Sequence, residues 1–259
     1  AASDVYKRQM KNLFELCKPR EDVFKEFQQD DALDLANLAD NSIDAKLFFD
    51  ETYVTSGMND LVDKAFSRFA GVGTTGLIRL KQAMGGGKTH NMVALGLLAR
   101  YPEYRKYMQK DSIHGVSDKI RVVSYTGRNS DIPYGLWGEI AKQIGKFDQF
   151  RPYYNPVLAA PGQNAWIELL KGEPVLILLD EMPPYLSYLR TRQVGTGTLA
   201  DITVTALANL FNALNKPELS NVCVVISDLN ATYDNGSELI NKSFKDIDGE
   251  ISRTAINIE

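Results

Sequence analysis

From Gly76 onward the sequence alternates short apolar runs with longer segments in which apolar residues recur every three or four positions. Short continuous apolar runs are typical of strands buried on both faces, and the longer spacing is typical of helices with one buried face. The pattern predicts strands at 76–82, 119–125, 174–180 and 221–227, and helices at 88–101, 133–144, 163–171 and 199–214. Because strands that alternate with helices form parallel sheets with crossover helices, we expect an α/β fold with a central, mostly parallel sheet flanked by helices.

The segments between these elements carry turn and loop signals. Gly145 and Gly172 follow two of the predicted helices and are expected to end them. Residues 102–118 are polar and are expected to form a connection, and residues 181–198 are expected to form a loop.

The N-terminal part of the chain has a different pattern, in which single apolar residues stand between charged ones. We expect residues 10–70 to form a helical segment that packs on a core made of residues 71–259. Within residues 1–9, the sequence Ser3–Gln9 resembles a translated sequencing-adapter remnant, so this prefix is expected to be non-native. Glu259 falls inside an apparent element, and the core is therefore expected to be truncated at its C-terminal end.

Composition narrows the class of protein. With 259 residues, 44% of them hydrophobic, the chain can bury a full core. No apolar run reaches about 18 residues and the start is too polar for a secretory signal, so we expect a cytoplasmic protein with no membrane span. The net charge of -4 gives no global basic field for nucleic acid, although it leaves room for a local patch.

Cysteine and histidine are scarce, at two residues each. Cys17 and Cys223 lie in no metal-ligand spacing, so we expect reduced packing thiols. His90 and His114 are far apart in the sequence, which argues against a histidine-based metal site.

The candidate chemistry begins with the sequence Gly-Gly-Gly-Lys-Thr at 85–89, between a predicted strand and a predicted helix. Glycines lack a Cβ, so backbone N–H groups can turn inward around phosphate oxygens, and the helix presents its positive end to the same anion. In such a loop Lys88 reaches the β- and γ-phosphates and Thr89 places its hydroxyl on Mg²⁺. The usual motif also has a glycine where this chain has Gln82. The alternative is a glycine-rich turn with an exposed lysine.

A second signature is the pair Asp180-Glu181 at the carboxyl end of an apolar strand, where ligands bind in open parallel sheets. The pair lies 92 residues after Lys88, which is enough chain to wind through another strand and return beside the first. Asp180 is then expected to hold Mg²⁺ opposite the Thr89 hydroxyl, and Glu181 to orient and polarise the attacking water. A glutamate that activates water is needed by a hydrolytic ATPase, so Glu181 favours this class over a small-molecule kinase or a GTPase. The alternative is a solvated loop start.

Two further stretches refine the nucleotide site. The sequence 215–218, Asn-Lys-Pro-Glu, superficially resembles a guanine-reading signature, but it follows a predicted helix and contains a helix-breaking proline. Adenine is therefore the expected base. Ser227 and Asp228 end the strand beside the expected γ-phosphate and are candidate sensor residues, although strand ends are also polar for solubility.

Several arginines allow a functional and a structural interpretation. Arg253 is a candidate arginine finger supplied to a neighbouring subunit, or a surface residue. Arg190 and Arg192 could contact nucleic acid or a partner, and the sequence 151–154, Arg-Pro-Tyr-Tyr, could stack bases. For both, the alternative is a solvated loop with tucked aromatic rings.

Five segments together resemble the ATPase family catalogued as domain of unknown function 499, and the resemblance runs from about Met10 over nearly the whole chain. They are Leu16–Arg20, Gln82–His90, Leu136–Ala141, Pro174–Glu181 and Val225–Leu229. The family implies a P-loop NTPase fold of the AAA type, within the ASCE class. Its members commonly lack the first loop glycine, so Gln82 agrees with it. They are much longer than this chain and are often encoded beside DNA methyltransferases and helicases in restriction-like or phage-defence clusters.

The sequence and the resemblance together predict an ATP-hydrolysing, AAA-like module of a prokaryotic DNA-modification or phage-defence system, with ATP and Mg²⁺ as cofactors. Lys88 and Glu181 are the expected catalytic residues, and Thr89 and Asp180 the expected metal ligands. The residues expected to bind the nucleotide are Gly85, Gly86, Gly87, Lys88, Thr89 and His90. The alternatives are a nucleotide-gated scaffold with negligible turnover and a DNA-translocating motor subunit. Expected partners are DNA, modification or defence proteins, and further copies of the full-length chain.

Overall fold

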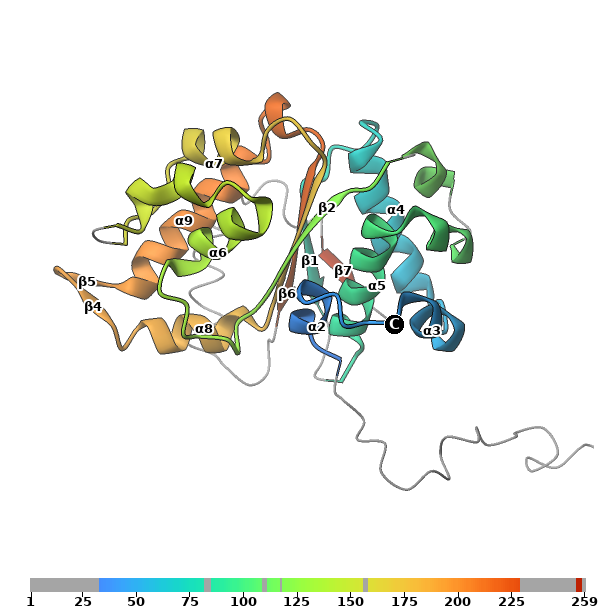
Figure 1. Cartoon of the computed structure of the whole chain (residues 1–259), viewed down its shortest axis with the longest axis horizontal. Coiled ribbons are helices and arrows are strands. Elements are labelled where there is room, and N and C mark those ends of the chain that lie inside the picture. The colour runs from blue at the N-terminus through green and yellow to red at the C-terminus, as the bar shows by residue number, and fades with distance from the viewer. Residues whose placement is uncertain are drawn as a thin grey trace, which may run out of the picture. The chain divides into compact units, whose positions relative to one another are not determined.

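The computed structural model describes residues 33–81, 85–108, 111–116, 118–155, 158–228 and 255–257. Its centre is a five-stranded sheet in the order β2-β3-β6-β1-β7, and every neighbouring pair is parallel (Figure 1). The strands are β1 (Leu77–Lys81), β2 (Arg121–Thr126), β3 (Val175–Asp180), β6 (Val222–Asp228) and β7 (Ala255–Asn257). The predicted α/β class with a central, mostly parallel sheet is therefore confirmed.

The strand order places β6 between the two strands that carry the sequence signatures. Val224 of β6 is in register with Leu77 of β1 on one side and with Ile177 of β3 on the other. On the outer side of β3, Thr126 of β2 is in register with Asp180. Because all these strands are parallel, their carboxyl ends meet at one edge of the sheet. Asp180 and Glu181 at the end of β3 and Ser227 near the end of β6 belong to that edge.

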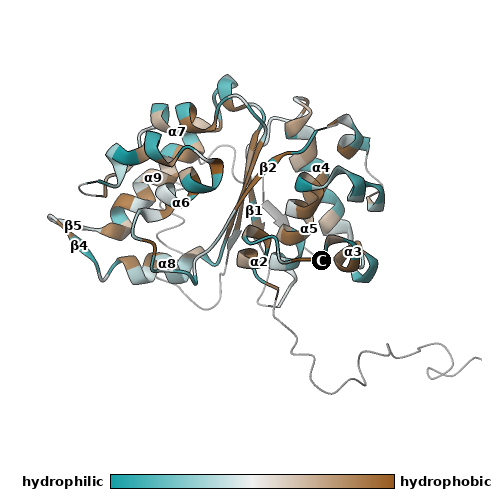
Figure 2. Ribbon diagram, in the orientation of Figure 1, coloured by the Kyte–Doolittle hydropathy of each residue, from teal (hydrophilic) through white to brown (hydrophobic). Residues whose placement is uncertain are grey.

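Helices cover both faces of the sheet. One face is covered by α2 (Leu35–Ala39), α3 (Ala45–Glu51), α4 (Ser56–Phe69) and α5 (Lys88–Arg100), and the other by α6 (Gly135–Ile144), α7 (Gln163–Leu170), α8 (Met182–Leu189) and α9 (Leu199–Ala213). Along β3, Ile177 packs in one of the two hydrophobic clusters and Leu178 in the other, as side-chain alternation requires. In Figure 2 the strands are coloured mainly as hydrophobic, and hydrophobic residues recur in the helices on both sides of the sheet.

Each strand and helix predicted from Gly76 onward is present, with ends that differ by one or two residues. Gly145 caps α6 in the left-handed conformation, at φ 80°, as expected. Helix α7 ends at Leu170 with Lys171 as its C-cap, and Gly172 follows at φ 107°. Helix α9 ends before the segment 215–218, so the interpretation of that segment as a helix stop is confirmed.

The expected loop at 181–198 is wrong. It contains the helix α8 and an antiparallel hairpin formed by β4 (Gln193–Val194) and β5 (Gly197–Thr198). Pro183 and Pro184 lie in the first turn of α8, where backbone N–H groups have no partner within the helix, so they are compatible with it. The expected polar connection 102–118 likewise contains two 3-10 helices, Pro102–Tyr107 and Asp111–Gly115, and two more lie at Phe147–Tyr153 and Pro217–Leu219.

The described part of the N-terminal segment, residues 33–70, is helical as predicted and packs directly on the sheet and on α5. Gly96 of α5 permits this contact, because a Cβ there would lie 2.4 Å from a methyl carbon of Leu38 in α2. Arg68 of α4 is buried and donates hydrogen bonds to the carbonyl oxygens of Leu214 at 2.7 Å and Leu219 at 2.8 Å. Residues 1–32, including the expected prefix 1–9, lie outside the described residues.

Two remaining sequence predictions concern thiols and membranes. Cys223 lies in the middle of β6 with no exposed surface, and burial raises the pKa of its thiol to about 12. It is therefore a protonated packing group, as expected, while Cys17 lies outside the described residues. Over the described ranges, no helix is both long enough and apolar enough to cross a membrane.

Candidate functional site

The glycine-rich turn leads from β1 into α5. Gly85 and Gly87 have φ values of 80° and 75°, which glycine adopts at no steric cost. Gly87 is the N-cap of α5 and offers no side chain to the first backbone N–H groups of that helix. Asn91 donates from Nδ2 to the Gly87 carbonyl at 2.8 Å and so fastens the turn to the helix. An anion at this helix end can therefore accept from N–H groups that no capping side chain occupies.

Lys88, the first residue of α5, is 7% exposed. A lysine in a solvated turn would be far more exposed, so the alternative of a glycine-rich turn with an exposed lysine does not fit. Residues 82–84 lie outside the described residues, and the part played by Gln82 stays a prediction.

Thr89 and Asp180 meet at the edge of the sheet, although they come from α5 and β3. The Thr89 hydroxyl donates to Oδ2 of Asp180 at 2.5 Å. From the intervening strand β6, the Ser227 hydroxyl donates to the other carboxylate oxygen, Oδ1. Asp180 is only 4% exposed, so these two hydroxyls replace water around a buried carboxylate. Three residues that the sequence singled out are thus brought into direct contact.

Glu181 follows Asp180 in an unusual backbone conformation. Its φ of 50° lies in the left-handed region, which costs a residue with a side chain about 1 kcal/mol or more. Its N–H is held by Oδ1 of Asp180 at 2.9 Å and by the Ser227 hydroxyl at 3.2 Å. These bonds fix the direction in which the Glu181 side chain leaves the strand end.

The turn after β2 lies directly against this peptide. The N–H of Gly127 donates to the Asp180 carbonyl at 2.9 Å, and a Cβ at position 127 would lie 2.1 Å from the Glu181 carbonyl oxygen. The next residue, Arg128, forms an ion pair with Glu181 through two nitrogens. Its Nη2 donates to Oε1 at 2.7 Å, and its Nε donates to Oε2.

Sequence reasoning missed Arg128. The strand predicted at 119–125 ends just before it, and the rule that selected Ser227, polar residues at the carboxyl end of a parallel strand, applies equally to this position. The position of Arg128 after a strand could be seen in the sequence. The strand order that places β2 beside β3, and so Arg128 beside Glu181, could not.

His90, expected among the nucleotide-binding residues, contacts α3 and the residue that follows it, Thr52. Its ring stacks on Phe48 of α3 with centroids 4.6 Å apart, and its Nε2 lies 3.0 Å from the Thr52 hydroxyl. The Thr52 hydroxyl donates its hydrogen to the Phe48 carbonyl at 2.6 Å. In the contact with His90 it must therefore accept, and Nε2 of His90 is the donor. Burial lowers the pKa of His90 and favours the neutral ring. A nucleotide contact by His90 stays a prediction.

Of the other candidates, Tyr153 and Tyr154 are partly buried. Tyr154 stacks on Phe147 with centroids 4.6 Å apart and donates its hydroxyl to the Phe147 carbonyl at 2.7 Å, which agrees with tucked aromatic rings. Arg190 is exposed. The side chain of Asp228 and the whole of Arg253 lie outside the described residues.

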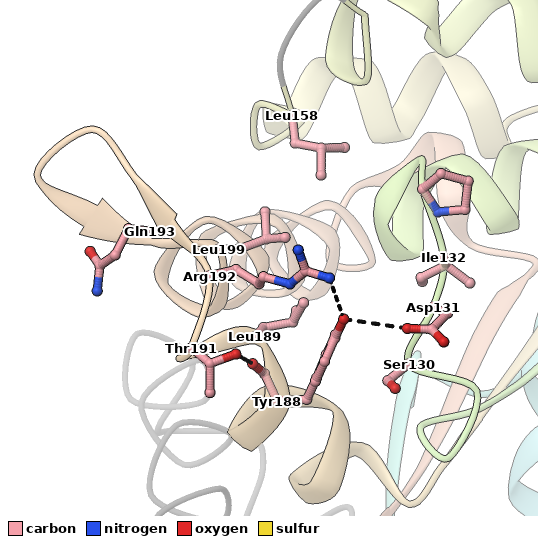
Figure 3. A pocket seen from close by; sticks show the side chains of 11 residues that line it. Ser130, Asp131, Ile132, Leu158, Tyr188, Leu189, Thr191, Arg192, Gln193 and Leu199 are labelled. Atoms are coloured by element: carbon pink, nitrogen blue, oxygen red, sulfur yellow. Dashed lines mark hydrogen bonds between the residues drawn. The ribbon is translucent and has the colours of Figure 1, made fainter.

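Arg192 lines a hollow of about 690 Å³ between the loop after β2, the end of α8 and the hairpin (Figure 3). Its Nη2 donates to the Tyr188 hydroxyl at 2.6 Å, and that hydroxyl lies 3.3 Å from Oδ1 of Asp131. Leu158, Leu189 and Leu199 supply apolar walls. None of the glycine-turn residues borders the hollow, so it is separate from the Thr89–Asp180 contact.

The fold and the site define the class of the protein as a mixed α/β domain whose central parallel sheet gathers polar residues at one edge. A family model described as the DUF499 N-terminal domain matches residues 14–132 and 130–257. These ranges cover most of the chain, and the chain belongs to this family. Among proteins with curated descriptions, none matches it significantly.

Proposed function

We propose that this domain is a P-loop NTPase module of the AAA type that binds ATP with Mg²⁺ and hydrolyses it. The observation that carries the proposal is the 2.5 Å contact between the Thr89 hydroxyl and the Asp180 carboxylate. Thr89 is the second residue of a helix that follows a glycine turn, and Asp180 ends a strand that is not adjacent to β1. The strand β6 between β1 and β3 is the arrangement expected of P-loop ATPases with an extra strand between their two nucleotide motifs.

The glycine turn and the start of α5 supply the phosphate site of this proposal. Gly85, Gly86 and Gly87 would expose backbone N–H groups to the phosphate oxygens, and α5 would direct its positive end at them. Lys88 is held at the same helix start with little exposure to water. Its ammonium would gain more from a phosphate oxygen there than at an open surface, because water screens the attraction less.

The donor set at Thr89 and Asp180 fits Mg²⁺. Both residues offer hard oxygen ligands. Among the described residues, no cluster of three or more His, Cys, Asp or Glu side chains could hold a metal ion. Mg²⁺ commonly takes one or two protein ligands and completes its shell with water and phosphate oxygens. When bound, it would neutralise charge on the β- and γ-phosphates.

Glu181 would then serve as the base for the attacking water. In hydrolysis the water oxygen bonds to the γ-phosphorus, the bond to the β,γ-bridging oxygen breaks, and Glu181 accepts the proton of the water. The N–H contacts of Glu181 and its position next to Asp180 hold it beside the metal ligand. Ser227, bonded to Asp180 and to the Glu181 N–H, would couple the two acids as a sensor residue.

The biological setting forms part of the proposal. A role in a prokaryotic DNA-modification or phage-defence system, with DNA or defence proteins as partners and further copies in an assembly, follows from the family resemblance of the sequence motifs. A nucleotide-gated scaffold would bind ATP without turnover, whereas a DNA-translocating motor would hydrolyse faster with DNA and lose that stimulation in salt.

Two substitutions test the proposed function. Lys88→Ala removes the phosphate-binding ammonium and is expected to abolish ATP binding, measured by titration with a fluorescent ATP analogue. Glu181→Gln is expected to bind ATP with wild-type affinity and to lower phosphate release by about a hundredfold or more, the scale of a lost general base. Lys171→Ala is the matched control, because Lys171 is exposed and forms an ion pair with the nearby Glu168 of the same surface.

Three outcomes separate the candidates. Wild-type affinity for ATP in Lys88→Ala would refute the nucleotide site itself. Full hydrolysis by Glu181→Gln would remove Glu181 from its role and leave the site intact. ATP binding without turnover, with and without DNA, would favour the scaffold.

A further inference from the structure

The hollow beside Arg192 has the size of a small-molecule site. Its volume is about 690 Å³, and it is lined by the loop 130–133 after β2, the end of α8, the start of the hairpin, Leu158 and Leu199. Small-molecule sites of proteins commonly have volumes of about 300–1,000 Å³. The hollow can therefore admit a small organic ligand.

The walls of the hollow carry apolar side chains that the protein does not cover completely. Ile132, Leu158 and Leu199 pack against the hydrophobic cluster between the sheet and α6–α9, and all three stay partly exposed. Figure 3 shows them on different sides of the Arg192 guanidinium. An apolar group placed among them would remove apolar surface of both molecules from water, which favours binding.

Two opposite charges stand at this hollow without pairing. The Tyr188 hydroxyl lies between them: it accepts from Nη2 of Arg192 at 2.6 Å and lies 3.3 Å from Oδ1 of Asp131 (Figure 3). The guanidinium also lies over the Tyr188 ring, 5.4 Å from its centroid. Among the described residues, neither Arg192 nor Asp131 forms an ion pair. One tyrosine thus holds both charges in place, a single hydroxyl apart.

Both charged groups keep unused hydrogen-bonding capacity. A guanidinium has five N–H donors and a carboxylate has two acceptor oxygens, whereas Tyr188 uses one nitrogen of Arg192 and one oxygen of Asp131. A ligand with negative charge alone would be attracted by Arg192 and repelled by Asp131, and a ligand with positive charge alone would meet the reverse. A small molecule that carries both charges close together satisfies both groups.

An α-amino acid carries its ammonium and its carboxylate on the same carbon atom. We propose that the hollow binds a free α-amino acid with a large apolar side chain. Arg192 pairs with the α-carboxylate and Asp131 with the α-ammonium. The apolar side chain of the ligand packs among Ile132, Leu158 and Leu199. This binding does not require the nucleotide site, because none of the glycine-turn residues borders the hollow.

The first test varies the ligand. Binding to the full chain, without nucleotide, is measured by ligand-observed NMR titration. L-phenylalanine and L-leucine are expected to bind saturably, with a Kd on the order of 1 mM. Hydrocinnamate lacks the ammonium of L-phenylalanine, phenethylamine lacks its carboxylate, and free glycine lacks its side chain. Each of these should bind about tenfold more weakly than L-phenylalanine, or not detectably.

The second test varies the protein. Arg192→Met and Asp131→Asn each remove one exposed charge, so the fold should be retained, which thermal unfolding checks. Both substitutions should weaken the binding of L-phenylalanine by about tenfold. Asp131→Asn should also strengthen the binding of hydrocinnamate, because the repulsion of its carboxylate is removed. Arg190→Met is the matched control, since Arg190 is exposed on the same segment but does not line the hollow.

Four results would overturn the proposed amino-acid site. They are no saturable binding of either amino acid up to roughly 10 mM, equal affinity of the wild type for hydrocinnamate and L-phenylalanine, and unchanged binding of L-phenylalanine in both variants. The fourth is equally tight binding of N-acetyl-L-phenylalaninamide, which has neither charge and would identify the hollow as a docking site for a peptide chain. Because no nucleotide is present, each result leaves the proposed ATP site standing.

Discussion

At the scale of single residues, the candidate site depends on backbone conformations that a sequence pattern cannot display. Glu181 adopts a left-handed conformation, and Gly127 is restricted to glycine because any Cβ would strike the Glu181 carbonyl. These two constraints act together, since the missing side chain at 127 makes room for the peptide of Glu181. A glycine at the end of a strand therefore has a steric reason here, whereas in the sequence it is only a turn signal.

The pH dependence of stability is a prediction at this scale, and it concerns His90. Burial lowers the pKa of His90 below its ordinary value of 6.5, so the folded state favours the neutral ring. Its contribution to stability is present above pH 6.5 and is lost as the pH falls from the unfolded value toward the lower folded value. We expect the stability advantage of the wild type over His90→Gln to shrink between pH 7.5 and pH 5.5.

Urea unfolding of both proteins at the two pH values measures this effect. Titration of the remaining groups is common to the pair and cancels in the difference. An advantage that stays constant or grows on acidification would contradict the assignment of a half-buried, neutral ring between Phe48 and Thr52.

At the scale of elements, the hydrophobic pattern predicts strands and crossover helices well. Each strand buries a continuous run of apolar residues, and each helix buries an apolar stripe along one face. The same pattern misses α8, which has eight residues and carries two prolines in its first turn. The order of the strands is also invisible to it, since register and neighbours are set by long-range packing. The approach of Thr89 to Asp180 could therefore be expected from two motifs, whereas the approach of Arg128 to Glu181 could not.

The docking of α4 provides a prediction at the element scale. Arg68 is buried, and its guanidinium satisfies carbonyl oxygens at Thr74, Leu214, Leu219 and Val222. Burial lowers the pKa of Arg68. Arg68→Met keeps much of the volume but leaves these carbonyls without their donor, and is expected to lower the free energy of unfolding by about 3 kcal/mol.

Lys64→Ala on the same helix is the control, because Lys64 is only partly buried. Its effect should stay within about 0.5 kcal/mol. Comparable losses in the two variants, measured by urea unfolding, would show that Arg68 contributes no more than an ordinary side chain of α4.

At the scale of the whole molecule, the site ties together elements from both halves of the sequence. The glycine turn, β3 and β6 contribute Thr89, Asp180 and Ser227 to one set of contacts. A ligand bound there stabilises the entire folded state, because the unfolded chain cannot assemble the site.

We therefore expect MgATP to raise the unfolding midpoint of the wild type in proportion to the logarithm of its concentration. At one hundred times the Kd the gain is about 2.7 kcal/mol in the free energy of unfolding. Lys88→Ala should show no such gain. Equal stabilisation of both proteins in a thermal unfolding series would place the nucleotide elsewhere on the chain.

The protonated thiol of Cys223 in the middle of the sheet has a practical consequence for labelling chemistry. Alkylating reagents react with the thiolate. In the folded protein the Cys223 sulfur is protonated and buried, so it is protected from them. Since the chain has two cysteines, replacing Cys17 by serine leaves Cys223 as its single sulfhydryl. A cysteine introduced at the exposed position of Arg128 would then react first, so a fluorophore placed there could follow the surroundings of Glu181 in real time.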